Sequence, residues 1–224
     1  MLKLLSKNFG ERDPNLPIDM IVIHYTGMQT KEMSISRMCD QSSEVSAHYL
    51  IDEDGVTYNL VSEKYRAWHA GVSYWKGEKD TNSRSIGIEL QNPGHDWGYT
   101  SFPEVQMRAL IELTKEIIDR YGISKRMVLG HSDVAPDRKL DPGHLFDWKL
   151  MAAAEAGYWP NFTPKLPPAN QSRIRDSLTK IGYNPNVGIV EIIKALQLHY
   201  RPTLINGKID NECWGIICAL KKNL

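Results

Sequence analysis

Two histidines and one aspartate of this chain could together bind a metal ion. His24 ends an apolar run, and the segment 130–143 contains His131 and Asp141, ten residues apart. Two imidazoles and one carboxylate would give a metal three protein ligands and leave a fourth position for water, as in hydrolytic zinc sites. Two prolines prevent a continuous helix within this segment, so a loop must return Asp141 to the strand that ends at His131. A hydrogen-bonded structural histidine beside an ordinary Asp-Pro-Gly turn is the alternative that these residues alone leave open.

The elements that must carry these residues are predicted to be short inner strands. Residues 20–24, 86–90 and 127–131 are aliphatic runs, each with a polar residue within it or at its end, as is typical of strands buried on both faces of a sheet. Residues 47–51 and 56–60 flank an Asp-Glu-Asp-Gly turn, whose Asp-Gly step favours a hairpin of two antiparallel strands. The sequence therefore predicts a sheet that holds His24 and His131 at strand ends.

One long helix is predicted between the strands at 86–90 and 127–131. Ser101 and Glu104 have the spacing of a capping box, and Gly122 is a helix-stopping residue. Between them, apolar residues recur on one face of a helix, at positions 107, 110, 111, 117, 118 and 121. Such a helix would cover one face of the sheet.

The chain is predicted to divide into two folded parts. Residues 158–170 contain four prolines in thirteen positions and no apolar periodicity, which is typical of a stiff linker. Beyond it, three short stripes of apolar residues indicate a small module of three helices. The predicted organisation is a domain over 1–157 that contains all three candidate ligands, a proline-rich linker over 158–170 and a helical domain over 171–224.

The overall charge argues against partners that need a strong electrostatic field. Lysine plus arginine equals aspartate plus glutamate at 27 each, so nucleic acid and anionic membrane surfaces are not expected partners. The three cysteines form no C-x-x-C pair and are odd in number, which indicates neither a disulfide framework nor a cysteine zinc site. No transmembrane segment is expected, and the first residues lack an apolar core of signal-peptide length.

Five motifs resemble those of one enzyme family. They are HYT at 24–26, SAHYLI at 46–51, RAWHAG at 66–71, SIGIEL at 85–90 and GHSDVAPDRKLDPG at 130–143. Their order resembles that of the bacterial zinc-dependent N-acetylmuramoyl-L-alanine amidases of the AmpD and AmiD type, over residues 17–160. The resemblance implies an α/β fold in which helices flank a mixed central β-sheet, as in peptidoglycan recognition proteins.

The resemblance also implies a role for each candidate residue. His24, His131 and Asp141 would hold one Zn²⁺ per chain, and Glu89 and Lys139 would act in catalysis. An unpaired carboxylate within an aliphatic strand is costly to bury, so Glu89 is expected to face the reacting water; the alternative is a strand-edge glutamate in solvent. Lys139 lies two residues before Asp141 in what is expected to be an extended segment, so it would approach the substrate oxygen. The alternative is a salt bridge from Lys139 to Asp137 or Asp133 on an exposed loop.

Three further residues are expected to line a substrate cleft. They are Trp68, His69 and Asn92, because an aromatic face can stack on a sugar ring and an amide group can bind the stem peptide. The C-terminal part resembles small peptidoglycan-binding domains through residues 192–200 and 205–210, although a leucine stands where a basic residue often follows the glutamine. This second resemblance implies binding to the cell wall.

The function that these resemblances imply is hydrolysis of the amide between the lactyl group of N-acetylmuramic acid and L-alanine, in peptidoglycan or in anhydro-muropeptides. Two alternatives are a non-catalytic peptidoglycan recognition protein, which typically lacks a metal ligand, and a zinc hydrolase of another amide. The lack of a visible signal peptide favours the cytoplasm, whereas a wall-binding module favours the periplasm or cell envelope. The sequence leaves the oligomeric state open.

Overall fold

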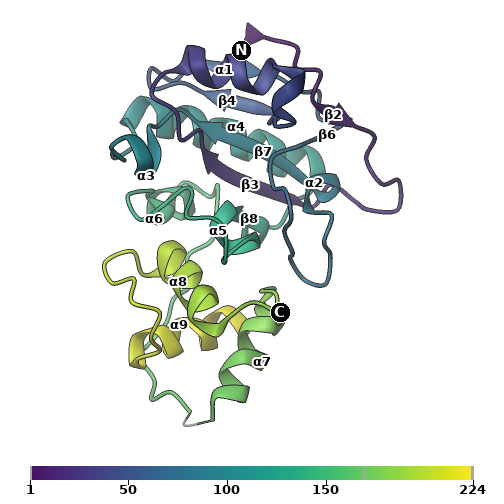
Figure 1. Ribbon diagram of the computed structural model, residues 1–224. Coiled ribbons are helices and arrows are strands. Elements are labelled where there is room, and N and C mark those ends of the chain that lie inside the picture. Colours follow the sequence, from purple (N-terminus) through teal and green to yellow (C-terminus); the bar gives the residue numbers. More distant parts are fainter. Residues whose placement is uncertain (1, 169, 223–224) are drawn as a thin grey trace.

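A mixed β-sheet forms the centre of the molecule. The computed structural model describes residues 2–168 and 170–222, and within them six strands form the sheet in the order β1-β5-β4-β7-β3-β8. In that order the strands are β1 (Leu2–Lys3), β5 (Thr57–Asn59), β4 (Tyr49–Ile51), β7 (Ser85–Leu90), β3 (Met20–Tyr25) and β8 (Val128–Gly130). A small separate ribbon pairs β2 (Phe9–Gly10) with β6 (Arg66–Ala67). Figure 1 shows these strands in the upper part of the molecule.

The central strands run parallel, so their carboxyl ends meet at one edge. β3 pairs in parallel with both β7 and β8, and its first four residues are fully buried because they are apolar and covered on both faces. The register places His24 directly opposite Glu89. The predicted antiparallel hairpin is confirmed by the pairing of β4 with β5. The sheet thus brings two candidate residues from distant parts of the chain side by side.

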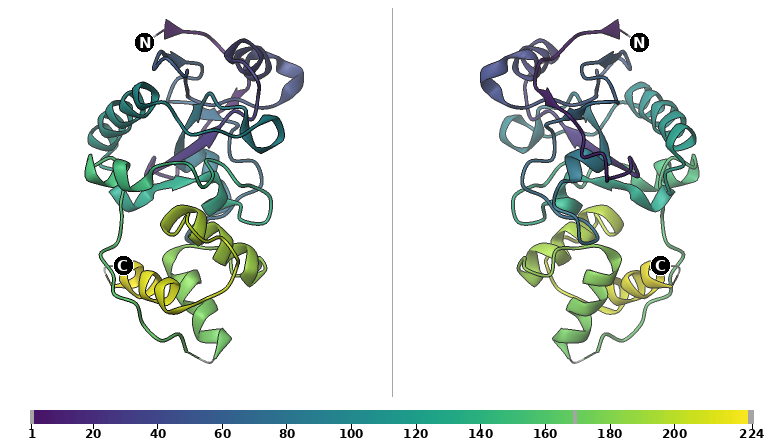
Figure 2. Two further views of the ribbon diagram at one scale, coloured as in Figure 1. Left: turned by 90° about the vertical axis from the view of Figure 1, so that its left-hand side faces the viewer. Right: turned by 90° about the vertical axis from the view of Figure 1, so that its right-hand side faces the viewer.

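Two helices cover opposite faces of the sheet (Figure 2). On one face, α4 (Glu104–Tyr121) packs against a cluster that includes Tyr49 and Ile51; on the other, α1 (Lys31–Cys39) packs against Leu50. This alternation follows from the two-residue period of a strand. Within the described chain the shorter helices are η1 (Gln41–Ser43), α2 (Thr81–Arg84), α3 (Gly94–Trp97), η2 (Lys125–Met127), α5 (His131–Val134) and α6 (Trp148–Ala153).

The ends of α4 test the predicted helix signals. The helix does end at Gly122, which adopts a left-handed conformation with φ 65°. The predicted capping box is wrong, because Pro103 stands at the N-cap position and no side chain caps the helix. Proline fixes a backbone angle suited to a helix start, so it takes the place expected for Ser101.

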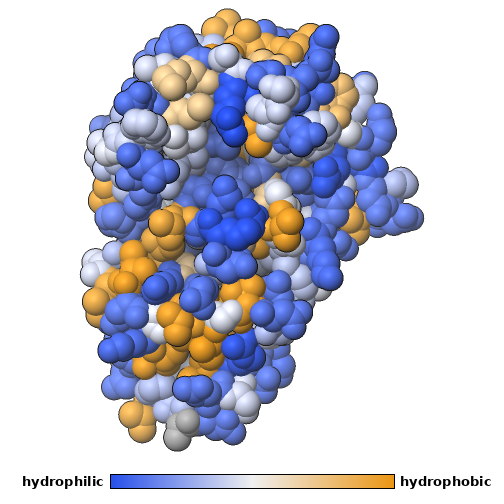
Figure 3. All heavy atoms as spheres, viewed as in Figure 1, coloured by the Kyte–Doolittle hydropathy of each residue, from blue (hydrophilic) through white to orange (hydrophobic). Residues whose placement is uncertain are grey.

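The C-terminal part contains the three helices expected from its apolar stripes: α7 (Gln171–Ile181), α8 (Ile189–Tyr200) and α9 (Asn211–Lys221). They lie below the sheet in Figure 1, with α8 packed on α5. Their buried residues join the same hydrophobic cluster as the sheet and α4. On the face shown in Figure 3, hydrophobic side chains gather around α8 among hydrophilic ones. The division into separate domains stays a prediction, and the described packing between the two parts is continuous.

Among the residues that the structure describes, no helix has the length and apolar character needed to cross a membrane.

Candidate metal centre and active-site pocket

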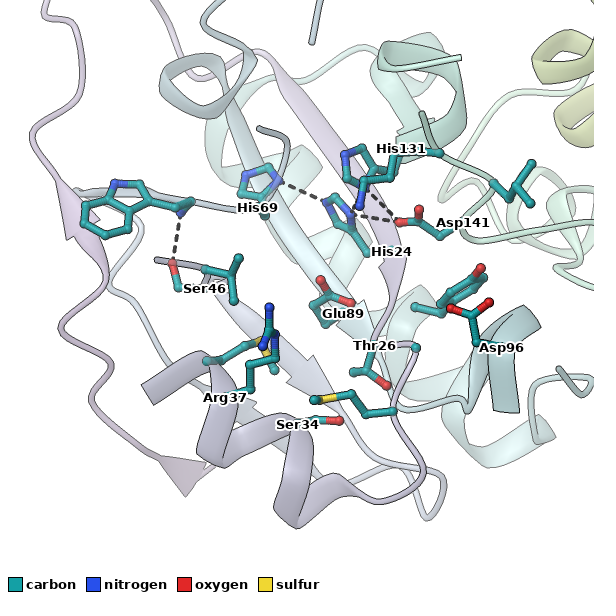
Figure 4. A pocket seen from close by; sticks show the side chains of 18 of the residues that line it. His24, Thr26, Ser34, Arg37, Ser46, His69, Glu89, Asp96, His131 and Asp141 are labelled. Carbon is teal, nitrogen blue, oxygen red and sulfur yellow. Dashed lines mark hydrogen bonds and ion pairs between the residues drawn. The ribbon is translucent and has the colours of Figure 1, made fainter. Parts of the chain in front are cut away.

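A pocket of about 420 Å³ opens where β3 and β7 end (Figure 4). Its walls come from these strand ends, from α1, from the segment around Trp68 and from the segment 130–143. The structure therefore brings together most of the residues that the sequence singled out, although they lie far apart along the chain.

Three buried side-chain atoms that could bind a metal converge on one side of this pocket. His24 Nδ1 lies 2.9 Å from His131 Nδ1 and 3.1 Å from Asp141 Oδ2, and His131 Nδ1 lies 3.0 Å from the same oxygen. Two ligands about 2.0 Å from a tetrahedral zinc are separated by roughly 3.3 Å, close to these separations. The three side chains thus fit a zinc site of the kind that the sequence predicts.

Local folding explains why the three atoms meet. His24 stands near the end of β3, and His131 begins α5 directly after β8, the strand that pairs with β3. The loop that follows returns toward the sheet, because the backbone N–H of Ser132 donates to the carbonyl of Asp141 at 2.9 Å. The predicted return of Asp141 to the end of this strand is confirmed.

Hydrogen bonds on the far side of each ring fix the tautomers. His131 Nε2 lies 3.0 Å from the carbonyl oxygen of Ala70, which can only accept, so Nε2 carries the proton and Nδ1 is free to bind a metal. The tautomer of His24 is fixed by a series of hydrogen bonds that runs through Ser85 and His69. The Ser85 hydroxyl donates to the Thr81 carbonyl at 2.6 Å, and its oxygen lies 3.2 Å from Nε2 of His69.

The same series of hydrogen bonds continues from His69 to His24. Because His69 uses Nε2 as a donor to Ser85, its Nδ1 is an acceptor, and it lies 3.0 Å from Nε2 of His24. His24 therefore donates a hydrogen bond through Nε2. Its Nδ1 carries no proton and faces Nδ1 of His131 and Oδ2 of Asp141. His69 acts here as an orienting partner of a candidate ligand.

The electrostatics of the three residues also suit a cation. Burial, together with the nearby His131, lowers the pKa of His24 to about 4, so this imidazole is neutral at neutral pH. Burial alone would raise the pKa of Asp141, but the two histidines hold it well below its usual range. Two imidazole lone pairs and a carboxylate that face one another at 3 Å repel, and a cation between them removes the repulsion.

Glu89 projects from β7 into the same pocket. Its Oε2 atom is buried and has no hydrogen-bond partner among the described residues. Burial raises the pKa of this carboxyl to about 8; the charge of Asp141 acts in the same direction, and that of Lys139 opposes both. A carboxyl with a raised pKa and a free oxygen beside a metal site has the properties of a general base.

Lys139 and Trp68 line the pocket as the sequence predicts. The backbone of Lys139 differs from the expected extended form, because its N–H donates to the Ala135 carbonyl at 3.0 Å in a turn. Of the two aspartates named as alternative partners, Asp133 binds Gly130, Tyr183 and His199 instead, as described below, and no salt bridge joins Lys139 to Asp137 among the described residues.

Asn92 lies outside the pocket, in contrast to the prediction. It is buried, its amide donates to the Thr100 carbonyl at 2.9 Å, and its Oδ1 accepts the N–H of Gly94 at 3.0 Å. Its side chain therefore holds the loop after β7. His69 does line the pocket, but it is buried and its ring nitrogens are engaged by His24 and Ser85.

The orienting role of Ser85 was not predicted, although a pattern in the sequence points to it. Ser85, Gly87 and Glu89 alternate along β7 and so share one face of the strand. A Cβ atom on Gly87 would lie 2.4 Å from the ring of His69, so glycine leaves the space that this histidine occupies. One strand face thus supports a ligand through Ser85 and supplies the acidic group through Glu89.

Comparison with known sequences identifies relatives over most of the chain. Residues 14–144 match the family described as N-acetylmuramoyl-L-alanine amidase. N-acetylmuramoyl-L-alanine amidase AmiD of Escherichia coli is 38% identical over 229 residues, which cover 91% of this chain and 82% of that relative. The 1,6-anhydro-N-acetylmuramyl-L-alanine amidase AmpD of Haemophilus influenzae is 33% identical over 165 residues, covering 66% of this chain and 88% of that relative.

Two solved structures match over nearly the whole length of the chain. AmiD from E. coli, in complex with the substrate anhydro-N-acetylmuramic acid-L-Ala-D-γ-Glu-L-Lys, matches with a TM-score of 0.82 at 34% identity, over 96% of this chain and 97% of that one. AmpDh3 from Pseudomonas aeruginosa, in complex with an anhydromuramic pentapeptide, matches with a TM-score of 0.83 at 30% identity, over 99% and 98%. The predicted mixed sheet flanked by helices is confirmed. On its sequence and its fold, the chain belongs to the N-acetylmuramoyl-L-alanine amidase family and is an amidase of the AmpD/AmiD type.

Proposed function

We propose that the chain binds one zinc ion through His24, His131 and Asp141 and hydrolyses the amide between the muramic acid lactyl group and L-alanine. The observation that carries this proposal is the convergence of three buried side-chain atoms that can bind a metal, beside the carboxyl oxygen of Glu89 that has no hydrogen-bond partner among the described residues. When bound there, zinc supplies Lewis-acid chemistry, because it polarises a carbonyl and lowers the pKa of a water molecule.

Glu89 accepts a proton from the attacking water. Its carboxyl stands opposite His24 in the sheet register and lines the pocket, so it could reach a water molecule that a zinc ion on His24, His131 and Asp141 would hold. The water oxygen then bonds to the lactyl carbonyl carbon, and the carbon–nitrogen bond breaks. Glu89 returns the proton to the leaving nitrogen, so that the products are a lactyl carboxylate and the free amine of L-alanine. No serine or cysteine nucleophile is needed.

Lys139 stabilises the negative charge that develops on the carbonyl oxygen. Its side chain lines the pocket, and its positive charge already acts on Glu89 and His24. A preorganised cation that meets this charge in the transition state contributes on the order of a hundredfold in rate. Trp68, on the wall of the pocket, offers an aromatic face to the sugar.

The substrates proposed are soluble anhydro-muropeptides, in cell-wall recycling. This choice is supported by two relatives of the same fold that were solved with anhydromuramyl peptides. The pocket is lined mainly by polar groups and is only partly enclosed, which suits a sugar–peptide conjugate that extends beyond it. A different amide substrate is the second candidate, because the metal and Glu89 act on a carbonyl and not on muramic acid itself.

Metal analysis tests the proposed site. Purified protein should contain about one zinc per chain, and His131→Ala should lose it because one of only three protein ligands is removed. Glu89→Gln should retain the zinc, since Glu89 is not one of the ligands. Full zinc occupancy in His131→Ala, or active protein that contains no metal, would contradict the proposal.

A further inference from the structure

A buried carboxylate joins the C-terminal helices to the turn that carries His131. Asp133, in α5, is 1% exposed, and both of its oxygens accept hydrogen bonds. Oδ1 accepts the hydroxyl of Tyr183 at 2.8 Å, and Oδ2 accepts Nδ1 of His199 at 2.7 Å. Oδ2 also accepts the backbone N–H of Gly130 at 2.9 Å. Two of its three partners therefore come from the C-terminal part, 50 and 66 residues further along the chain.

The position of Asp133 connects these bonds to the candidate metal site. It lies two residues after His131 in the single turn of α5, and its bond to Gly130 closes that turn. The same turn is held from other sides by the Ser132 N–H, which donates to Asp141, and by His131 Nε2, which donates to Ala70. The bonds from Tyr183 and His199 to Asp133 therefore act on the same turn.

His199 is itself held in place by aromatic rings. Its ring stacks on Trp148 at 3.7 Å between centroids and on Tyr200 at 3.9 Å. The ring is 1% exposed, and its Nε2 has no hydrogen-bond partner among the described residues. The bond from Nδ1 to Asp133 is therefore the hydrogen bond that the ring makes there. A buried imidazole with one directed bond to a buried carboxylate is an arrangement that orients the carboxylate.

Tyr183 is also held in place by close packing, against the segment that contains Trp75 and Lys76. Its ring packs edge-on against Trp75 at 5.0 Å, and the backbone N–H of Lys76 donates to the Gly182 carbonyl at 2.9 Å. A Cβ atom on Gly182 would lie 2.5 Å from the Trp75 ring, so the glycine permits this approach. The C-terminal helices are docked on the domain that holds the ligands, and α8 lies directly against α5 (Figure 1).

We infer that His199 and Tyr183 are positioning residues for the amidase reaction: through Asp133 they hold the turn that presents His131 to the metal. The inference rests on the proposed metal role of His131. The C-terminal helices then contribute to catalysis on every substrate, including soluble ones, in addition to any contact with the cell wall. Without its two distant partners, the buried carboxylate of Asp133 would turn toward water and carry the His131 turn with it.

Variants of the full-length chain test this inference. Tyr183→Phe removes one hydroxyl and keeps the packing, and His199→Phe removes the donor and keeps a stacked ring. Loss of such an outer partner costs about tenfold or more in metal affinity or activity. Each variant should therefore raise the Kd for zinc and lower kcat on a soluble anhydro-muropeptide by about tenfold, with KM within about twofold of the wild type. His199→Asn, whose amide nitrogen can replace Nδ1, should recover part of both losses.

Tyr158→Phe is the matched control. The Tyr158 hydroxyl accepts a hydrogen bond from Arg126 at 2.6 Å, and the same guanidinium donates to the carbonyl of Leu220 in α9 at 2.8 Å, so Tyr158 also lies where the two parts of the chain meet. No hydrogen bond joins it to Asp133 among the described residues. It should leave the Kd for zinc and kcat unchanged. Folded Tyr183→Phe and His199→Phe proteins with wild-type zinc affinity and kcat would overturn the inference, even if their Tm is lower. A wild-type chain without metal-dependent activity would instead overturn the proposed function, and the inference with it.

Discussion

His24 and His69 form a directed pair in which Nε2 of His24 donates to Nδ1 of His69 at 3.0 Å. The direction is set by Ser85, whose hydroxyl is used as a donor to Thr81 and so leaves its oxygen to accept from His69. The pair therefore decides which nitrogen of His24 is available at the candidate metal site. His69 was expected to contact substrate, but its two ring nitrogens bind His24 and Ser85 instead.

The first prediction is that His69→Phe weakens zinc binding. The phenyl ring fills the space beside Gly87 but cannot accept the proton of His24, so the ligand loses its orienting partner. The Kd for zinc should rise about tenfold, the scale found for partners of metal ligands. Competition with a chelator of known affinity measures it. If His69 serves only as a substrate contact, KM will rise while the Kd for zinc stays at the wild-type value.

The second prediction is that Glu89→Gln keeps its zinc and loses turnover. Glutamine has the same shape but cannot take up the proton of the attacking water, so kcat should fall roughly a hundredfold or more. Glu63→Gln is a control that removes a carboxylate outside the pocket, where it accepts hydrogen bonds from Arg120 and Tyr121. Steady-state kinetics on a soluble muropeptide compare the two. Near-normal turnover in Glu89→Gln would show that another group acts as the base.

The third prediction concerns pH. A base works in its ionised form, so the rate should rise with pH through the pKa of Glu89, which is about 8 without a cation and lower when a metal is bound. Lys139 lowers this pKa by its charge. Lys139→Met should therefore move the acidic limb of the kcat/KM profile to higher pH, besides lowering kcat roughly a hundredfold.

Lys139→Arg is the charge-preserving control for this shift. Its acidic limb should stay close to that of the wild type, whatever happens to the maximal rate. An unchanged limb in Lys139→Met would mean that Lys139 and Glu89 do not interact in the working enzyme.

The fourth prediction is that His24 stays neutral in acid. In metal-free protein its pKa is lowered to about 4 by burial and by His131, whereas an unfolded histidine titrates near 6.5. NMR titration of the ring should therefore show a midpoint near pH 4. Since the unfolded chain binds this proton first, the metal-free protein should lose stability as the pH falls from about 6.5 toward 4. A midpoint near 6.5 would show that the ring is more hydrated than its burial indicates.

Local patterns predict the strands of the sheet and point to three candidate metal ligands, but they do not decide that these three residues bind a metal. The aliphatic run before His24 predicts a buried strand. Pro136 and Pro142 exclude a continuous helix through the segment that contains His131 and Asp141, so a returning loop is required. Parallel pairing of β3 with its neighbours then brought the ligands together, as strand ends of a parallel sheet must do. Resemblance to a known family supplied what these patterns left open, namely the metal and the reaction.

Features that depend on distant contacts could not be predicted in the same way. Asp133 stands in the motif around His131, and nothing near it in the sequence indicates that Tyr183 and His199 are its partners. The proline-rich segment suggested a tethered module, whereas the aromatic rings of Trp148 and His199 stack directly. The amide of Asn92 is of a type that can bind a stem peptide, but its hydrogen bonds to Thr100 and Gly94 hold it in the loop after β7.

Mass spectrometry of the products from a soluble anhydro-muropeptide tests the central claim most directly. The account predicts an anhydro-sugar with a free lactyl carboxylate and a peptide that begins with L-alanine, formed by the zinc-loaded chain, lost on chelation and restored by zinc. Cleavage at a different bond, or undiminished cleavage by protein shown to be free of metal, would contradict it.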